Sequence, residues 1–243
     1  VTEVGEINRC TAIQLRHELE QNDVAAVVAV ESHHTVRHGW VRLPELVRLA
    51  HEYSVPVILD GAAQDQRLAE LVEIGCDLVI ASAHKFLCST TAGIVAGQKD
   101  LVDAVYLQNR GIGRGMKAGK EAILGVMAAL EYRMQQEMGE WTAEQDRKVQ
   151  LILDQLSGVP GLALSVDPDP NGCPFSRARL TPDQQQDGLT ARQLSDALAE
   201  GDPTVVARAH HADEGYIYLD AIEMTDADIQ LACERVRHIL AGP

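Results

Sequence analysis

The sequence predicts an α/β protein: a large domain built on a mostly parallel sheet, followed by a small C-terminal α+β domain. Short apolar runs bounded by turn residues alternate with segments of helical periodicity, which is typical of parallel strands joined by crossover helices. Near residue 138 a long helix leaves the sheet part. We therefore expect domains over residues 1–138 and 139–243, and a hydrophobic content of 46% is sufficient for their cores.

In the first domain the elements are predicted from apolar patterns and breaker residues. Residues 24–30 form a continuous apolar run, as in a strand buried on both faces of a sheet. Pro44 is predicted to open a helix, because the first turn does not need its missing N–H. The other expected elements are helices over residues 11–21 and 66–74, and strands over residues 56–59, 77–81 and 93–96.

The second domain is predicted to begin with helices and to continue with short strands. Apolar residues recur at helical spacing from residue 120 to residue 138, and another helix is expected to begin near Trp141. The remaining predicted elements are strands over residues 162–166, 175–180, 205–209 and 216–219, and helices over residues 190–200 and 225–240.

Composition excludes several classes of function. The formal net charge of -15 argues against a nucleic-acid partner, because an acidic surface repels phosphate backbones. No apolar stretch approaches the roughly 18 residues of a membrane helix, and no signal-peptide pattern is found, so we expect a cytoplasmic protein without a membrane partner. The five cysteines form no C-x-x-C pair, and the histidine groups at residues 33–38 and 210–211 lack other ligands at metal-binding spacing. No metal site is expected.

The ends of two strands carry the residues that indicate a chemistry. Asp60 follows the predicted strand at residues 56–59, and Ser82, His84 and Lys85 follow the next strand. Ligands of open α/β sheets bind beyond the carboxyl ends of strands, so a carboxylate and an amine are expected in one crevice. Pyridoxal 5'-phosphate (PLP) needs this pair, because a carboxylate keeps its ring nitrogen protonated and a lysine forms the Schiff base. Alone, such a lysine is usually a solvated surface residue.

Neighbouring polar side chains complete the predicted cofactor site. Ser82 and His84 can hydrogen-bond the cofactor phosphate, and Gln64 can reach the phenolic oxygen of the ring. The small residues 88–93 let the backbone approach a ligand closely. The predicted cofactor-binding residues are Asp60, Gln64, Ser82, His84 and Lys85, and Lys85 is also the predicted catalytic acid and base.

The run Ser82-Ala83-His84-Lys85-Phe86, followed by a glycine-containing strand, resembles the fold-type-I PLP-dependent enzymes, which are aspartate aminotransferase-like. This resemblance implies a large PLP-binding domain and a small C-terminal domain. Residues 3–9 and 113–121 further resemble the group related to bacterial selenocysteine synthase, which includes D-glucosaminate-6-phosphate ammonia-lyases. The similarity covers residues 1–133, with a weaker match at residues 201–208.

The resemblance implies a lyase that eliminates ammonia from an amino acid or a phosphorylated amino sugar acid. Arg114, Lys117 and Lys120 lie in a glycine-rich segment without acids, which suggests an anion site for the PLP phosphate or for a substrate phosphate. The alternative is a surface loop whose charges balance nearby acids. Family resemblance makes Arg208 the arginine that binds the substrate carboxylate, and the alternative is a solvated edge-strand residue.

Two departures from the family pattern affect this interpretation. Ala83-His84 stands where the selenium-transferring branch tends to have glycines, which weakens an interpretation linked to tRNA. The chain also begins after the region in which the family places its glycine-rich phosphate loop, so we expect an N-terminal portion to be missing. A neighbouring subunit or the missing residues must complete the pocket. A homodimer or higher homo-oligomer is therefore expected.

Four other functions stay open at the level of sequence, and one of them is a racemase or aldolase on the same scaffold. A cysteine desulfurase or selenocysteine lyase shares the Ser-x-His-Lys pattern, but it needs a nucleophilic cysteine on a mobile loop, for which Cys173 is the candidate. Selenium transfer onto seryl-tRNA calls for a basic surface. A PLP-binding regulatory or degenerate scaffold protein is the alternative outside enzymology.

Overall fold

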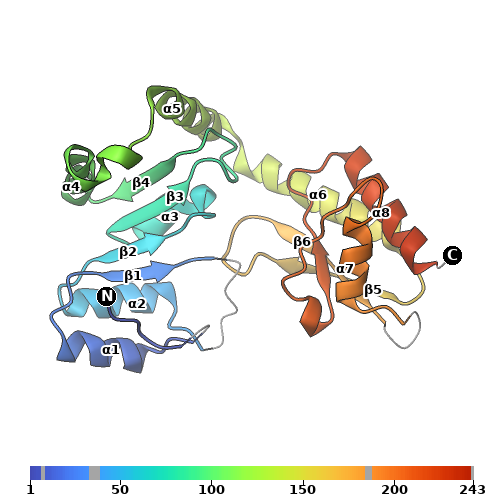
Figure 1. Ribbon diagram of the computed structural model, residues 1–243, viewed down its shortest axis with the longest axis horizontal. Helices are drawn as coiled ribbons and strands as arrows, with labels where there is room; N and C mark the ends of the chain where they lie inside the picture. The colour runs from blue at the N-terminus through green and yellow to red at the C-terminus, as the bar shows by residue number, and fades with distance from the viewer. Residues whose placement is uncertain (7–8, 33–38, 184–187, 242–243) are drawn as a thin grey trace. The chain divides into compact units, whose positions relative to one another are not determined.

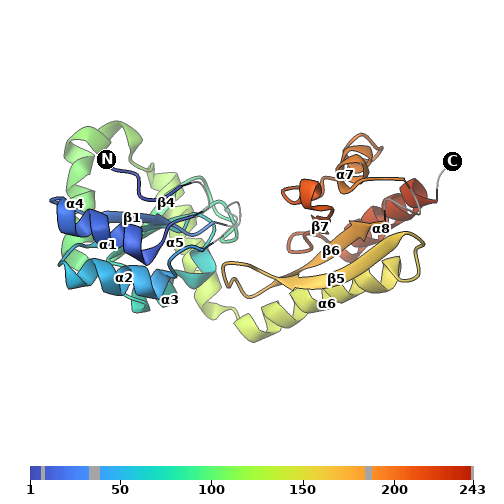
Figure 2. The same ribbon diagram turned by 90° about the horizontal axis from the view of Figure 1, so that it is seen from below.

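The computed structural model describes residues 1–6, 9–32, 39–183 and 188–241, and the chain divides into two compact units, Val1–Gln136 and Glu137–Pro243 (Figures 1 and 2). Each unit is treated by itself below. His33, His34 and His38 lie outside the described residues.

The first unit contains a four-stranded sheet in the order β1-β2-β3-β4. Its strands are β1 (Val27–Val30), β2 (Val57–Asp60), β3 (Leu78–Ser82) and β4 (Gly93–Gly97). The pairs β1–β2 and β2–β3 are parallel, as the sequence predicts, while β4 runs antiparallel to β3. The connection between β3 and β4 is too short for the crossover that a parallel pair requires.

Helices and short 3₁₀ turns connect these strands. The helices are α1 (Ala12–Gln21), α2 (Leu43–Glu52), α3 (Leu68–Glu73), α4 (Lys99–Leu107) and α5 (Lys120–Gln135), and the 3₁₀ turns are η1 (Asp65–Arg67), η2 (Gln108–Arg110) and η3 (Ile112–Met116). Thr11 caps α1 through a capping box with Gln14, and Pro44 lies in the first turn of α2 as expected. Helix α4 is not anticipated by the sequence analysis.

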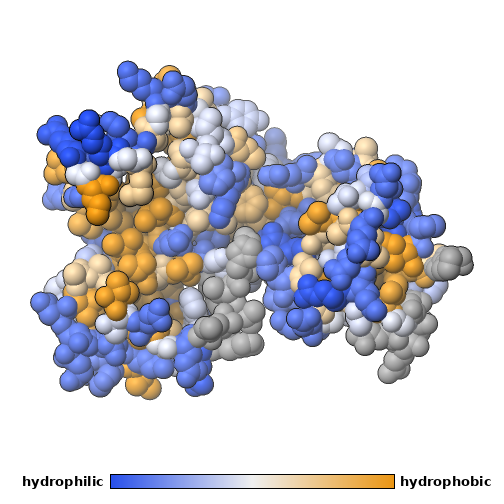
Figure 3. Space-filling model, viewed as in Figure 1, coloured by the Kyte–Doolittle hydropathy of each residue, from blue (hydrophilic) through white to orange (hydrophobic). Residues whose placement is uncertain are grey.

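The core of the first unit lies on one face of its sheet. Leu46, Leu49 and Ala50 of α2 are buried there together with Val57 and Leu59 of β2. Alternate residues of a strand point to opposite faces, and on the other face Val28, Val30 and Ile80 stay exposed by 68%, 39% and 39%. Apolar surface is visible over this unit in Figure 3.

The second unit is an α+β layer around an antiparallel sheet in the order β5-β6-β7. Its elements are α6 (Met138–Leu156), β5 (Leu162–Pro168), β6 (Ser176–Pro182), α7 (Ala191–Ala199), η4 (Ala212–Glu214), β7 (Ile217–Leu219) and α8 (Asp226–Leu240). Ile152, Leu180, Leu194, Ile217 and Ile229 are fully buried and join the helices to the sheet in one core.

The predicted strand over residues 205–209 is wrong. Only Arg208 pairs with the sheet, through one bridge in which it exchanges both main-chain hydrogen bonds with Tyr218, at 2.9 and 3.0 Å. The partner strand β7 is three residues long, so it offers room for little more than one bridge. Val206 is 82% exposed and contributes nothing to the core, although it is apolar.

In the described part of the chain, no helix has the length and apolar character needed to cross a membrane. Within the same residues, no group of three or more histidine, cysteine or acidic side chains is arranged to hold a metal ion. All five cysteines carry free thiols.

Candidate active site around Lys85

Main-chain hydrogen bonds join the segments that leave β2 and β3. The Gly61 N–H donates to the carbonyl of Ile80 at 2.9 Å, and the Ser82 N–H donates to the carbonyl of Ala62 at 3.0 Å. The two strands are parallel and in register, with Asp60 opposite Ile80. The structure therefore brings the segment that begins at Asp60 and the segment that begins at Ser82 to one edge of the sheet.

Asp60 is the last residue of β2, and it is exposed. Its Oδ1 accepts a hydrogen bond from the N–H of Ala62 at 3.1 Å, which fixes the carboxylate at the turn. The other oxygen can serve a ligand beyond the strand end, which is the place where open α/β sheets bind theirs.

Lys85 lies in a turn that several main-chain hydrogen bonds close. The Ala83 N–H donates to Ala92, the Ser89 N–H donates to Ala83, and the Cys88 N–H donates to the carbonyl of Lys85 itself, each at 2.9 Å. Ala83 is fully buried and anchors the turn, while Lys85 is half-buried. A turn closed by main-chain hydrogen bonds at the strand end suits a lysine that must reach a ligand held there.

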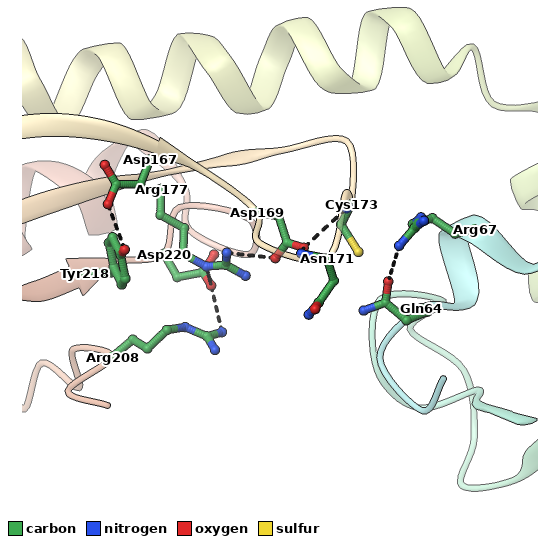
Figure 4. Close-up of polar contacts among 10 residues, drawn as sticks. All are labelled: Gln64, Arg67, Asp167, Asp169, Asn171, Cys173, Arg177, Arg208, Tyr218 and Asp220. Atoms are coloured by element: carbon green, nitrogen blue, oxygen red, sulfur yellow. Dashed lines mark hydrogen bonds and ion pairs between the residues drawn. The ribbon is translucent and has the colours of Figure 1, made fainter. Parts of the chain in front are cut away.

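The other predicted cofactor residues lie at different depths. Ser82 is half-buried at the end of β3, and His84 is exposed in the turn. Gln64 is 1% exposed, and its Oε1 accepts a hydrogen bond from Arg67 Nη1 at 3.1 Å (Figure 4). The contacts of Ser82 and His84 with the cofactor phosphate, and of Gln64 with the ring oxygen, stay predictions.

Helix α5 packs against the segment that follows Lys85, a contact that the sequence analysis missed. Thr90 Oγ1 donates to the carbonyl of Ala122 at 3.1 Å, and Arg133 Nη2 donates to the carbonyl of Phe86 at 2.5 Å. A Cβ at Gly125 would lie 2.9 Å from Thr90 Oγ1, so glycine permits the close approach of the helix. The sign of this contact in the sequence is Gly125 itself, because a glycine inside a long helical pattern often marks a close approach.

A buried acid beside this turn was also missed. Asp65 begins η1 and is 8% exposed. Burial raises the pKa of its carboxyl to about 6, although nearby peptide groups and the charges of Arg133 and Lys85 act to lower it. Sequence offers no sign of this, because an acid in a helix-opening turn is usually solvated.

The basic segment before α5 lies at the surface. Arg114, Lys117 and Lys120 are exposed, and none of them forms an ion pair within the described residues. Arg114 lies in η3, and Lys120 begins the helix that contacts Thr90. Their positive charges are therefore not neutralised by ion pairs within the described residues, and an anion site requires such unpaired charges. Their predicted contact with a phosphate stays a prediction.

Arg208 belongs to the second unit, where it takes part in a network of charged groups. Its Nη2 donates to Asp220 Oδ2 at 2.9 Å, and Arg177 Nε donates to the same oxygen at 3.1 Å. Arg177 Nη1 also donates to Asp169 at 2.8 Å (Figure 4). Arg208 is thus held in place rather than free in solvent. These contacts do not test whether Arg208 binds the substrate carboxylate, and that role stays a prediction.

Cys173 lacks the setting of a nucleophilic thiol. It is 7% exposed, and its N–H donates to Asp169 Oδ1 at 3.2 Å. A catalytic cysteine of a desulfurase needs an accessible sulfur on a mobile loop.

Parallel strands with an acid after one and a lysine after the next are typical of a class of cofactor-dependent α/β enzymes. The family model described as aminotransferase class-V matches residues 2–195, and the chain belongs to this family. Membership confirms the predicted fold class and implies PLP as the cofactor, as predicted.

Three kinds of curated relative are similar to this chain. A D-glucosaminate-6-phosphate ammonia lyase of Salmonella typhimurium is 30% identical over 98% of this chain and 63% of its own length. A 5'-C-glycyluridine monooxygenase-decarboxylase of Streptomyces is 31% identical over 98% and 59%. An L-seryl-tRNA(Sec) selenium transferase of Aquifex aeolicus is 24% identical over 85% and 52%. The predicted resemblance to the selenocysteine synthase-like group is therefore confirmed.

A solved structure of a D-glucosaminate-6-phosphate ammonia-lyase has a TM-score of 0.73 and 29% identity to this chain. The match covers 99% of this chain and 63% of that one. The chain spans about three fifths of the length of the first two curated relatives.

The residues at the strand ends fit PLP by their chemistry. An exposed carboxylate on Asp60 suits the ring nitrogen, and the amine of Lys85 lies in the adjoining turn. Ser82 and His84 provide a hydroxyl and an imidazole at the same sheet edge for the phosphate.

Proposed function

We propose that the protein containing this chain is a PLP-dependent lyase that releases ammonia from an amino acid or amino sugar acid by α,β-elimination. The observation that carries the proposal is the joined pair of segments after β2 and β3, which holds Asp60 and Lys85 at one sheet edge. The similarity to ammonia-lyases over nearly the whole chain supports the reaction class.

The predicted cofactor-site residues have separate tasks in this proposal. Asp60 holds the ring nitrogen of PLP, and Ser82 and His84 bind its phosphate. When bound, PLP supplies an electron sink that stabilises negative charge at the substrate Cα. Lys85 anchors the cofactor and then, as a free amine, removes the proton from Cα. Gln64 is proposed to orient the ring.

The elimination balances without an oxidant or a reductant. Lys85 takes the Cα proton, the Cα–H electron pair forms a double bond to Cβ, and the β-hydroxyl leaves as water after Lys85 returns that proton to it. The released enamine becomes an imine, and water hydrolyses that imine to a 2-keto acid and ammonium. One water is released and one is consumed, so the net change is the loss of ammonia.

The proposed substrate is a 2-amino sugar acid 6-phosphate. Arg114, Lys117 and Lys120 are exposed cations without ion-pair partners in the described part of the chain, and they lie in a segment with several glycines that leads into α5. Cations and accessible backbone together bind phosphate well. We propose this segment as the phosphate anchor. Arg208 is proposed to bind the substrate carboxylate.

A direct assay tests the reaction. The full-length protein loaded with PLP is incubated with amino sugar acids, their 6-phosphates, cysteine and serine, and ammonia and keto acids are measured by mass spectrometry. Ammonia from a 2-amino sugar acid 6-phosphate is expected. Release of ammonia from none of these compounds would refute the proposed lyase.

Matched variants test the assigned roles. Lys85→Ala is expected to abolish turnover and the absorbance of lysine-bound PLP. Lys117→Gln with Lys120→Gln is expected to raise KM for the phosphorylated substrate on the order of tenfold, with a smaller change for the unphosphorylated compound. Equal changes for both substrates would contradict the phosphate-anchor assignment.

The same screen separates the rival functions. Formation of alanine and persulfide from cysteine would indicate a desulfurase, against which the burial of Cys173 already argues. Carbon dioxide released from a glycyl-nucleoside would favour chemistry like that of the Streptomyces relative. PLP binding without turnover of any amine would favour a scaffold protein.

The proposed function includes self-association of the full-length protein. Large apolar side chains stay exposed on α5 in this chain, among them Leu124 at 64% and Met134 at 86%. Such surface is normally covered in a soluble protein. We propose that the full-length protein is a cytoplasmic homodimer or higher homo-oligomer that has no nucleic-acid or membrane partner.

A further inference from the structure

Arg208 is anchored at two points, through its main chain and through its side chain. Its main chain exchanges hydrogen bonds with that of Tyr218, at 2.9 and 3.0 Å. Its guanidinium donates from Nη2 to Asp220 Oδ2 at 2.9 Å (Figure 4). Tyr218 lies in β7, and Asp220 directly follows that strand. One short segment of the second unit therefore fixes both the backbone and the charged end of this long side chain.

Asp220 is held in turn by Arg177, which lies on the central strand β6 of the sheet. Arg177 Nε donates to Asp220 Oδ2 at 3.1 Å, so this oxygen accepts hydrogen bonds from both arginines. The side chain of Arg177 is 3% exposed, and its Cζ lies 4.8 Å from the centre of the Phe175 ring. Asp220 is thus bound to a buried, closely packed group that has little freedom to move.

Asp169 forms the other end of this network. Its Oδ2 accepts a hydrogen bond from Arg177 Nη1 at 2.8 Å, and its Oδ1 accepts the main-chain N–H groups of Asn171 and Cys173 at 2.9 and 3.2 Å. The network contains two acids and two arginines whose charges balance: Asp169, Arg177, Asp220 and Arg208. Apolar side chains of similar volume often stabilise a fold as well as buried ion pairs do. Stability alone therefore does not account for this arrangement.

The network leads from the interior of the second unit toward its surface. The side chains of Asp169 and Arg177 are 2% and 3% exposed, whereas those of Asp220 and Arg208 are 23% and 20% exposed. Nε of Arg208 is buried and has no partner among the described residues. The part of the guanidinium that a ligand can reach is therefore its terminal end, and this is the end that Asp220 holds.

We propose that Asp220 is a positioning residue for Arg208: Arg177 fixes Asp220, and Asp220 fixes the guanidinium in one orientation for the substrate carboxylate. Ordering a flexible arginine on binding costs affinity, so an arginine that is already ordered binds a carboxylate more tightly. The inference rests on the proposed role of Arg208 as the carboxylate-binding residue. It deepens that role, because it assigns the selectivity for a carboxylate to a pair of residues.

Charge alone predicts the opposite effect of Asp220. A carboxylate oxygen 2.9 Å from the Arg208 guanidinium offsets part of its positive charge and repels an incoming anion. If attraction decides, removal of Asp220 tightens the binding of a carboxylate. If orientation decides, removal weakens it, because the guanidinium loses its fixed place. The sign of the change therefore distinguishes the two effects.

The test compares two amines that differ only at one carbon. The full-length protein loaded with PLP is titrated with D-glucosaminate 6-phosphate and with 2-amino-2-deoxyglucitol 6-phosphate, an alcohol in which a hydroxymethyl group replaces the carboxylate. Binding is read from the absorbance of lysine-bound PLP, which changes when an amine displaces the lysine. Asp220→Ala should raise the half-saturating concentration of the acid on the order of tenfold, and that of the alcohol less than about twofold.

Two further variants complete the comparison. Asp220→Asn keeps an oxygen that can accept from both arginines, so its half-saturating concentration for the acid should lie between those of Asp220→Ala and wild type. Asp213→Asn removes an exposed acid of the same unit and is the control without a change. Thermal melting checks each fold, and if Asp220→Ala does not fold, Asp220→Asn decides. Tighter or unchanged binding of the acid, or equal weakening of acid and alcohol, would overturn the inference.

Arg208→Gln separates this inference from the proposed function. It should weaken binding of the acid far more than binding of the alcohol. If it affects both compounds equally, or if the wild-type protein binds neither, the proposed role of Arg208 fails and the inference fails with it. If Arg208→Gln is selective for the acid while the Asp220 variants are not, only the present inference fails.

Discussion

Replacing Asp65 with asparagine should stabilise the protein at neutral pH. The carboxyl has a pKa of about 6 in the folded protein, against an ordinary value of 3.8. The folded state therefore binds the proton more tightly than the unfolded state does. The stability associated with the protonated form is fully present below about pH 4, and it is lost as the pH rises through 6.

The size of the effect follows from this difference in pKa. Two pKa units correspond to about 3 kcal/mol, and the low exposure of Asp65 leaves little screening by solvent. Asparagine has nearly the shape of the neutral acid. Asp65→Asn should thus be more stable than wild type by on the order of 2–3 kcal/mol at pH 7.5, with a difference near zero at pH 4.

Urea unfolding at pH values from 4 to 8 measures the effect. The sequence has two tryptophans, so a Trp141→Phe background leaves Trp40 as the reporter for the unit that contains Asp65. A difference in the free energy of unfolding that does not change with pH, or that grows toward acid, would refute the reasoning. Asp228 is a control of opposite sign, because hydrogen bonds from Thr225 lower its pKa, and Asp228→Asn should lose stability at neutral pH.

Three further predictions concern packing, the site and assembly. Arg177→Met leaves Asp169 buried without its ion pair and should cost about 3–5 kcal/mol in urea unfolding, while the exposed Arg192→Met should cost less than about 0.5. Gly125→Val should weaken PLP binding in a fluorescence titration at least about tenfold, because its Cβ displaces Thr90 and the Lys85 turn; Gly139→Val, with open space around it, is the control. Leu124→Glu should shift the full-length protein toward smaller species in light scattering, and an unchanged mass would count against self-association through α5.

The sequence predicted the parts of the fold that depend on local pattern. The apolar run of β1, Pro44 in α2 and the order of Asp60 and Lys85 after successive strands all give signals within a few residues. The parallel pairs follow because connections long enough for helices separate their strands. The same reasoning implies an antiparallel β4, since residues 83–92 leave no room for a crossover, but this was not drawn from the sequence.

Features that depend on tertiary contacts were not predictable. Residues 205–209 have the β-branched composition of a strand, yet the sheet offers them only the short edge of β7. Asp65 and Arg133 are far apart in the sequence and look like ordinary charged surface residues. Only folding buries Asp65 beside the Lys85 turn and brings Arg133 against the carbonyl of Phe86.

The difference between Asp60 and Asp65 shows what these contacts add to the site. Asp60 is exposed and receives a hydrogen bond from its own turn, so its carboxyl group costs the fold little. Asp65 is buried and should reduce stability at neutral pH. A costly group is retained where chemistry needs it, and perturbed acids concentrate at active sites for this reason. Stability that rises on Asp65→Asn while turnover by the PLP-loaded protein falls would therefore identify the position as one kept for function.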